Sequence, residues 1–321
     1  MNVPRLSWRP ARWALLRPLS TGAPDQVRQV VELRLQRAGR TGLGEAAPLP
    51  GLHRETVEDV VSHLRRLSMH LRQQPPASSP VAAARQLGLA LPPSLGWALD
   101  WAWHDLTEPE PALPAPPSAG LLLEPPESWH AAVAAAPDCR CWKLKIGRHD
   151  PLAEARAFRG LARDFPRHEW RLDANRAFPL AEARAFQAAA APARPRWIEE
   201  PLASVAQLAD WLAGGGWPLA LDESLREALP AGLAERAAAW VLKPQLLGLA
   251  TVEESFERVR RLAAAGGSAP CCVISACFES PLGLRALEQL AARAPGRPAP
   301  GLGTRAWLGA RLDELDWEDG A

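Results

Sequence analysis

The sequence predicts an α/β protein: a (β/α)7–8 TIM-like barrel preceded by an N-terminal α+β capping domain. Three observations predict it. The chain has 321 residues, enough for about two domains. Short apolar runs alternate with helical stretches through its second part, as they do in β/α barrels. A proline-rich segment, residues 111–120, separates this part from a first part with a different rhythm.

Residues 1–110 read as the capping domain. Two stretches, 13–20 and 27–39, have the composition of antiparallel strands, and the glycine- and proline-rich stretch 41–51 is expected to form turns. Apolar residues at helical spacing predict helices over 55–74 and 94–106. We expect the tail, 305–321, to fold back and join this domain.

Residues 118–304 read as the catalytic barrel. Eight apolar runs recur at roughly 20 to 30 residues, the period of a β/α unit. Eight such units predict an eight-stranded barrel; the last run is a poor strand, so the alternative is seven strands with a degenerate eighth. The runs are 118–123, 142–147, 170–175, 196–201, 218–224, 239–244, 273–279 and 300–304.

Composition excludes several classes of protein. Basic residues number 37 and acidic residues 36, a balance that argues against nucleic-acid binding. There is no uncharged apolar run of 18 residues, so membrane insertion is not expected, and arginine and proline interrupt the N-terminus before a signal-peptide core. We therefore expect a cytoplasmic protein, monomeric or homo-oligomeric, with five reduced cysteines.

Lysine is almost absent from the chain. Only Lys143, Lys145 and Lys243 occur, and the other 34 of the 37 basic residues are arginine. Arginine cannot lose its proton in a protein, whereas lysine can. Arginine stands at every other basic position, so the lysines retained in two apolar strands are candidates for proton transfer or covalent chemistry.

Carboxylates stand at the carboxyl ends of the neighbouring runs, where barrel active sites form. Asp173, Glu199 and Asp222 lie on three successive strands, and three oxygen ligands with room for water favour Mg²⁺, or Mn²⁺. Glu200 and Glu223 are adjacent in sequence to these ligands and are expected to point away from the metal. One expected role for them is to pair with the lysines. Two further polar residues, Arg171 and Asn175, lie in the same predicted strand as Asp173. Arg171 could equally form an ion pair inside the barrel.

This constellation favours abstraction of a proton from the carbon next to a carboxylate. A divalent cation stabilises the enediolate that develops, and lysines on the strands before and after the carboxylates can act as base and acid. All seven histidines lie at or before His168, which excludes a histidine base late in the barrel.

These residues resemble the enolase superfamily in its muconate-lactonising subgroup, and within it the o-succinylbenzoate synthase family. The resemblance runs in family order from residue 44 to residue 304. It rests on GEAAPLPG (44–51), KLKIG (143–147), RLDANRAF (171–178), IEEP (198–201), LDESLRE (221–227), LKPQLLG (242–248), ISACFESPLGL (274–284) and GLGT (301–304). The chain departs from the family at 276 and 277, where alanine and cysteine replace part of a serine-rich stretch.

The resemblance implies a reaction and roles. The reaction is the Mg²⁺-dependent syn-dehydration of 2-succinyl-6-hydroxy-2,4-cyclohexadiene-1-carboxylate to 2-succinylbenzoate in menaquinone biosynthesis. Asp173, Glu199 and Asp222 would bind the metal. Lys145 would be the base, Lys243 the opposing cation and Lys143 the support of Lys145. Ser275 and Gly301 match positions near the succinyl carboxylate. Apart from the resemblance, Asn175 and Arg171 are also expected substrate contacts.

Other functions stay open. A relative with the same two lysines could be an N-succinylamino acid racemase, a dipeptide epimerase or a cycloisomerase. A more distant alternative is a barrel enzyme with a Schiff-base lysine, which would need no metal. All of these enzymes act on small molecules. The synthase, the racemase, the epimerase and the cycloisomerase act on carboxylates.

Overall fold

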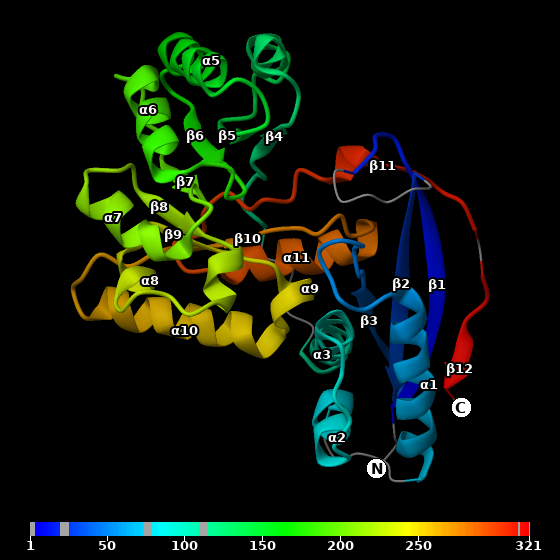
Figure 1. Cartoon of the computed structure of the whole chain (residues 1–321). Coiled ribbons are helices and arrows are strands. Elements are labelled where there is room, and N and C mark those ends of the chain that lie inside the picture. The colour runs from blue at the N-terminus through cyan, green and yellow to red at the C-terminus, as the bar shows by residue number, and fades with distance from the viewer. Residues whose placement is uncertain (1–3, 20–25, 74–78, 109–113, 314, 321) are drawn as a thin grey trace.

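The computed structural model describes the whole chain except residues 1–3, 20–25, 74–78, 109–113, 314 and 321. Figure 1 shows two parts: an antiparallel sheet with its helices, and a parallel barrel with helices around it. Helix α3 (Pro93–Thr107) lies between the sheet and the barrel. Within the described part of the chain, no helix is both long and apolar enough to cross a bilayer.

The first sheet is a meander closed by the C-terminal tail. Strands β1 (Arg5–Leu15), β2 (Val27–Arg37) and β3 (Arg40–Ala46) pair antiparallel in that order. Two strands from the tail, β11 (Leu308–Arg311) and β12 (Glu318–Gly320), pair with β1. The tail thus folds back onto the N-terminal unit. Along β2 the side chains of Val31, Leu33 and Leu35 are fully buried, beneath the helices α1 (Val57–Gln73) and α3; α2 (Pro80–Gln86) packs on α3.

The prediction of turns over residues 41–51 is wrong for its first half, because residues 40–46 form strand β3. Its glycines serve close packing rather than a turn. A Cβ atom at Gly42 would lie 2.0 Å from the carbonyl oxygen of Ala102, and one at Gly44 would lie 2.0 Å from that of Ala98. Both carbonyls belong to α3, so the glycines let this helix lie directly against the sheet.

We expect Gly44→Ala to lower the free energy of unfolding by about 3 kcal/mol, because α3 must move outward to admit the methyl group. Urea unfolding of the purified protein measures this change. Gly160→Ala is the matched control: Gly160 lies inside a helix with open space at its Cβ position. That variant should gain about 0.5–1 kcal/mol. Equal stability of Gly44→Ala and the parent protein would contradict the packing argument.

The barrel contains seven parallel strands in sequence order. Most of its outward-facing side chains are fully buried beneath the surrounding helices, as in other β/α folds. The strands are β4 (Gly120–Leu122), β5 (Cys141–Lys145), β6 (Glu169–Asp173), β7 (Trp197–Glu199), β8 (Leu219–Leu221), β9 (Ala239–Leu242) and β10 (Cys271–Ile274).

Residues 300–302 take the place of an eighth strand, so the alternative of seven strands with a degenerate eighth is confirmed. On one side, Gly301 forms an isolated parallel bridge with Ser275, and its N–H donates to the carbonyl of Ile274 at 2.8 Å. On the other side, the N–H of Ala119 donates to the carbonyl of Pro300 at 2.9 Å. These bonds close the barrel between β10 and β4.

Helices connect successive strands and cover the barrel (Figure 1). Several have clear start signals: Asp150 caps α5 by accepting from the N–H of Ala153 at 2.8 Å, and proline follows at the first helical position. The helices are α4 (Trp129–Ala134), α5 (Pro151–Asp164), α6 (Leu180–Ala190), α7 (Leu208–Ala213), α8 (Leu233–Arg236), α9 (Pro244–Leu247), α10 (Leu249–Ala264) and α11 (Pro281–Arg293).

Candidate active site

The register of the barrel aligns the predicted polar residues. Lys145 on β5 is the direct neighbour of Asp173 on β6, and Asp173 is the direct neighbour of Glu199 on β7. All three stand at the last position of their strands. Asp222 follows β8 and Lys243 follows β9 immediately. Five polar side chains from five successive strands therefore meet at the carboxyl end of the barrel.

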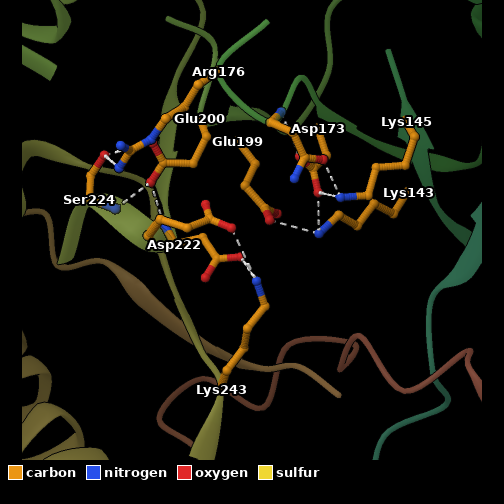
Figure 2. A network of polar contacts seen from close by, with 11 residues as sticks. Lys143, Lys145, Asp173, Arg176, Glu199, Glu200, Asp222, Ser224 and Lys243 are labelled. Atoms are coloured by element: carbon orange, nitrogen blue, oxygen red, sulfur yellow. Dashed lines mark hydrogen bonds and ion pairs between the residues drawn. The ribbon is translucent and has the colours of Figure 1, made fainter. Parts of the chain in front are cut away.

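The lysines approach the carboxylates from two sides (Figure 2). On one side, the Lys143 Nζ lies 2.6 Å from Asp173 and 2.7 Å from Glu199, and the Lys145 Nζ lies 2.5 Å from Asp173. On the other side, Lys243 pairs with Asp222, and its Nζ lies 3.4 Å from Glu223. Glu223 therefore lies within reach of Lys243, and its support of this lysine stays a prediction.

The three carboxylates are almost inaccessible to water: Asp173 is 1% exposed, Glu199 3% and Asp222 8%. Burial, together with the charges of Asp173 and Asp222, raises the pKa of Glu199 to about 8. Burial acts in the same direction on Asp173, but Lys143 and Lys145 outweigh it and hold its pKa well below the ordinary value. Burial and two neighbouring negative charges thus disfavour the ionised form of Glu199, and an added cation would stabilise that form.

The pKa values of two lysines are raised. Burial lowers the pKa of Lys143 and of Lys243, but the carboxylates beside them outweigh burial in both cases. Asp173 and Glu199 act on Lys143, and Asp222 and Glu223 act on Lys243. In this arrangement both lysines stay protonated, because each ammonium group compensates a buried carboxylate.

The donor set fits a hard divalent cation, since it consists of three carboxylates with further oxygen groups nearby. Within the described residues, no three acidic, histidine or cysteine side chains already converge as metal ligands. The reason is visible in the distances: the Lys143 Nζ lies between Asp173 and Glu199, and Lys243 holds Asp222. The ammonium groups thus pair with oxygens of all three carboxylates.

Glu200 performs a different task from the one predicted. It does not pair with a lysine; it accepts from the main-chain N–H of Asp222 at 2.8 Å and of Ser224 at 2.9 Å. It also accepts from the Ser224 hydroxyl at 2.6 Å and from Arg176 at 3.2 Å. Glu199 and Glu200 point to opposite sides, so one faces the site while the other fixes the backbone that carries Asp222 (Figure 2).

A pocket of about 190 Å³ lies next to the lysines that pair with the three buried carboxylates. Its polar side holds the three lysines and Asn175, whose side-chain oxygen accepts from Lys145. Its other side is apolar and comes from both parts of the molecule. The lining includes the predicted residues Ser275, Gly301 and Glu223. It also includes Ala276 and Cys277, where the sequence differs from the serine-rich stretch of the family.

Comparison with known proteins agrees with this geometry. The family model described as "Enolase C-terminal domain-like" matches residues 127–318, more than half of the chain. An o-succinylbenzoate synthase from Klebsiella pneumoniae (strain 342) is 31% identical over 312 residues, which cover 94% of this chain and 91% of the relative. This chain belongs to the o-succinylbenzoate synthase family of the enolase superfamily.

Solved structures share the fold. MenC from Desulfotalea psychrophila LSv54 has a TM-score of 0.72 and 24% identity, and the likeness covers 98% of this chain and 97% of that one. An o-succinylbenzoate synthase from Thermosynechococcus elongatus BP-1, described as complexed with Mg in the active site, has a TM-score of 0.67 and 24% identity. That likeness covers 95% of this chain and 94% of the other.

In this member of the o-succinylbenzoate synthase family, Arg171 lies apart from the other predicted residues. Its side chain is buried deeper in the barrel, two positions before Asp173 on β6. It forms an ion pair with Glu169 at 2.7 Å, donates to the carbonyl of Ala299 at 2.7 Å, and lies over the Trp197 ring. It does not line the pocket, so the structure favours the alternative of an internal ion pair over a substrate contact.

Sequence reasoning missed other lining residues of this family member. Leu52 comes from the capping domain, and Phe278 comes from the loop after β10. Leu49 also lines the pocket, and it lies in the capping loop around Pro48 to Gly51, which the resemblance implies to close over the substrate. Thr304 also lines the pocket; its hydroxyl oxygen is buried and, within the described part of the chain, has no hydrogen-bond partner. An unpaired buried hydroxyl is available to a bound ligand. The GEAAPLPG, ISACFESPLGL and GLGT motifs are the sequence signals that could have pointed to the segments that carry them.

Proposed function

We propose that this chain catalyses the dehydration of 2-succinyl-6-hydroxy-2,4-cyclohexadiene-1-carboxylate to 2-succinylbenzoate, as a hydro-lyase of menaquinone biosynthesis. One observation carries the mechanism: Lys145 and Lys243 stand on opposite sides of three buried carboxylates at the mouth of the barrel. Membership of the o-succinylbenzoate synthase family supports the choice of reaction.

Mg²⁺, or Mn²⁺, is the proposed cofactor, held by Asp173, Glu199 and Asp222. When bound, it supplies the positive charge that stabilises the substrate carboxylate while the neighbouring carbon loses its proton. The concentration of buried carboxylates supports this, since such charges are costly unless a cation compensates them. With the carboxylates compensated in this way, they no longer hold protons on the lysines, and a neutral lysine becomes accessible near pH 7.

Lys145 transfers the proton, and the other two lysines assist it. Lys145 removes the proton from the ring carbon that bears the carboxylate, and the same amine then returns it to the leaving hydroxyl on the same face. A C–H bond and a C–O bond break, water leaves, and the ring becomes aromatic. Lys243 stays protonated on the other face and stabilises the negative charge, while Lys143 orients Asp173 and so Lys145.

The pocket would hold the succinyl part of the substrate on the side away from the carboxylates. Ser275 and Gly301 lie next to one another through their backbone bridge, and both line the pocket. We propose them, together with Asn175, as contacts for polar groups of the substrate. The cytoplasmic location and the monomeric or homo-oligomeric state remain predictions.

The direct test is ultraviolet detection of 2-succinylbenzoate. The purified protein with Mg²⁺ should form it from the cyclohexadiene substrate, activity should disappear with EDTA, and added Mg²⁺ should restore it. Absence of product with Mg²⁺ present would refute the proposed reaction. Activity that resists EDTA and is blocked by borohydride would instead support a Schiff-base lysine.

The opposed lysines also favour a second function, racemisation or epimerisation of an N-acylated amino acid. Such a reaction needs proton exchange on both faces, with one lysine for each. In deuterated water, a racemase with Lys243→Ala should lose exchange from one enantiomer only. A dehydratase should show no turnover of N-succinylamino acids, so this measurement separates the two functions.

A further inference from the structure

A buried arginine joins two pocket-lining segments that are far apart in the sequence. Arg28 lies on β2 of the capping domain and is 2% exposed. Its guanidinium donates to five main-chain carbonyl oxygens. Two of them are in the capping-domain loop, Ala47 and Pro48, and two are in the loop after β10, Cys277 and Phe278; the fifth is Gln29.

The distances show that the guanidinium spans both loops. The Nη1 of Arg28 lies 2.6 Å from the carbonyl oxygen of Pro48, and its Nε lies 2.9 Å from that of Phe278. The Nη2 of Arg28 donates to the carbonyl oxygen of Ala47 in one loop and to that of Cys277 in the other. Arginine suits this position because its planar group directs five N–H donors in fixed directions, whereas lysine has only three around one nitrogen.

Each loop carries part of the apolar side of the pocket. The first continues to Leu49 and Leu52, and the second contributes Cys277 and Phe278. Phe278 has φ +61°, a left-handed backbone conformation that costs a non-glycine residue free energy. The hydrogen bond from Arg28 to its carbonyl helps to fix this conformation, and its ring packs edge-on against Trp307, with centroids 5.6 Å apart.

Neighbouring polar groups extend the connection to the catalytic strand. The Gln245 side chain, two residues after Lys243, accepts from the N–H of Ala47 at 3.0 Å and donates to the carbonyl of Glu45 at 2.9 Å. The Glu45 carboxylate accepts from the N–H of Ser280 at 2.9 Å. The capping loop, the loop after β10 and the end of β9 thus share one buried polar network centred on Arg28.

We infer that Arg28 is a positioning residue that fixes the apolar wall of the pocket by holding the two loops in register, and thereby determines how tightly the substrate is bound. Among the described residues, no hydrogen bond of this network reaches the three metal-binding candidates, so Arg28 acts on substrate binding rather than on the metal or the proton transfer. This inference rests on the proposed function for the identity of the substrate, but its structural part does not.

The test compares variants that separate hydrogen bonding from charge. Arg28→Met/Glu279→Gln removes one cation together with one of the two carboxylates beside it, so the buried charge stays balanced. The amide introduced at position 279 can still accept from the N–H of Cys277, as the carboxylate does. Arg28→Lys is the milder variant and keeps the charge but not the five donors. Arg34→Met, on the same strand but bonded to Ser7 and stacked on Trp317, is the matched control.

Two measurements are made on each protein with Mg²⁺: steady-state kinetics for 2-succinylbenzoate formation, and amide hydrogen exchange by mass spectrometry. We expect KM to rise about thirtyfold in Arg28→Met/Glu279→Gln and by a smaller factor in Arg28→Lys, while kcat changes by less than about threefold in both. Exchange should accelerate in residues 47–52 and 276–279 together, and stay unchanged in β5 to β9. Arg34→Met should match the parent protein in both measurements.

The inference is overturned if the Arg28 variants keep the parent KM, if only one of the two loops exchanges faster, or if kcat and KM change equally with faster exchange throughout the barrel. It is also overturned if Arg34→Met raises KM as much as the Arg28 variants do. Failure of the proposed function is a separate outcome: the parent protein would then give no 2-succinylbenzoate, and the exchange of the two loops would still decide the role of Arg28.

Discussion

Lys145→Met is expected to lower kcat for 2-succinylbenzoate formation by about 10⁴-fold, the upper range for loss of a general acid–base group. The physical reason is that Lys145 is the lysine at the end of β5, beside Asp173 and on the pocket wall, where it can reach a substrate proton. Lys145→Arg should not restore activity, because arginine keeps the positive charge but cannot give up its proton near pH 7.

Steady-state kinetics with saturating Mg²⁺ measures this loss, and a thermal shift on adding Mg²⁺ shows that the variant still folds and binds metal. Arg156→Met is the control: it removes an exposed cation from α5, outside the pocket, and should keep full activity. If Lys145→Met retained a tenth of kcat while Lys243→Met abolished turnover, the base would be Lys243.

Glu199→Gln is expected to weaken Mg²⁺ binding by at least about 100-fold, because it removes one of three charged oxygen ligands at the barrel mouth. At a Mg²⁺ concentration 100 times the parent Kd, the metal stabilises the parent by about 2.7 kcal/mol. A variant with 100-fold weaker binding gains only about 0.4 kcal/mol at the same concentration. The metal-free variant should be no less stable than the metal-free parent, because the amide replaces a carboxylate that burial disfavours.

Thermal unfolding over a Mg²⁺ series gives both quantities. Glu257→Gln, which removes an exposed carboxylate from α10, should bind Mg²⁺ as the parent does. Parent-like stabilisation of Glu199→Gln by Mg²⁺ would place the metal elsewhere, and a large loss of metal-free stability would mean that Glu199 acts chiefly as the partner of Lys143.

Much of the barrel and of the candidate site could be predicted because the signals are local. A parallel strand buried on both faces must be apolar, so a charge at its end stands out, as Lys145, Asp173 and Glu199 do. Chain order alone then placed these residues side by side, because successive parallel strands in a barrel are neighbours.

Other features escaped because they depend on contacts between distant residues. Strand β3 was mistaken for turns, since nothing near Gly44 in the sequence reveals that α3 lies against it. The task of Glu200 depends on Arg176 and Ser224, 24 residues away on either side. The bond between Arg28 and Phe278 joins positions 250 residues apart, and no periodicity signals it.

The sequence by itself determined which side chains meet at the mouth of the barrel, because strand periodicity and strand order are properties of the chain that need no partner to be read. Only the tertiary structure decided which of them point into the pocket, which serve as internal ion pairs, and how the capping domain closes one wall. Those outcomes depend on where buried hydrogen-bond donors find acceptors, and for Arg171, Glu200 and Arg28 the partners come from other segments of the fold.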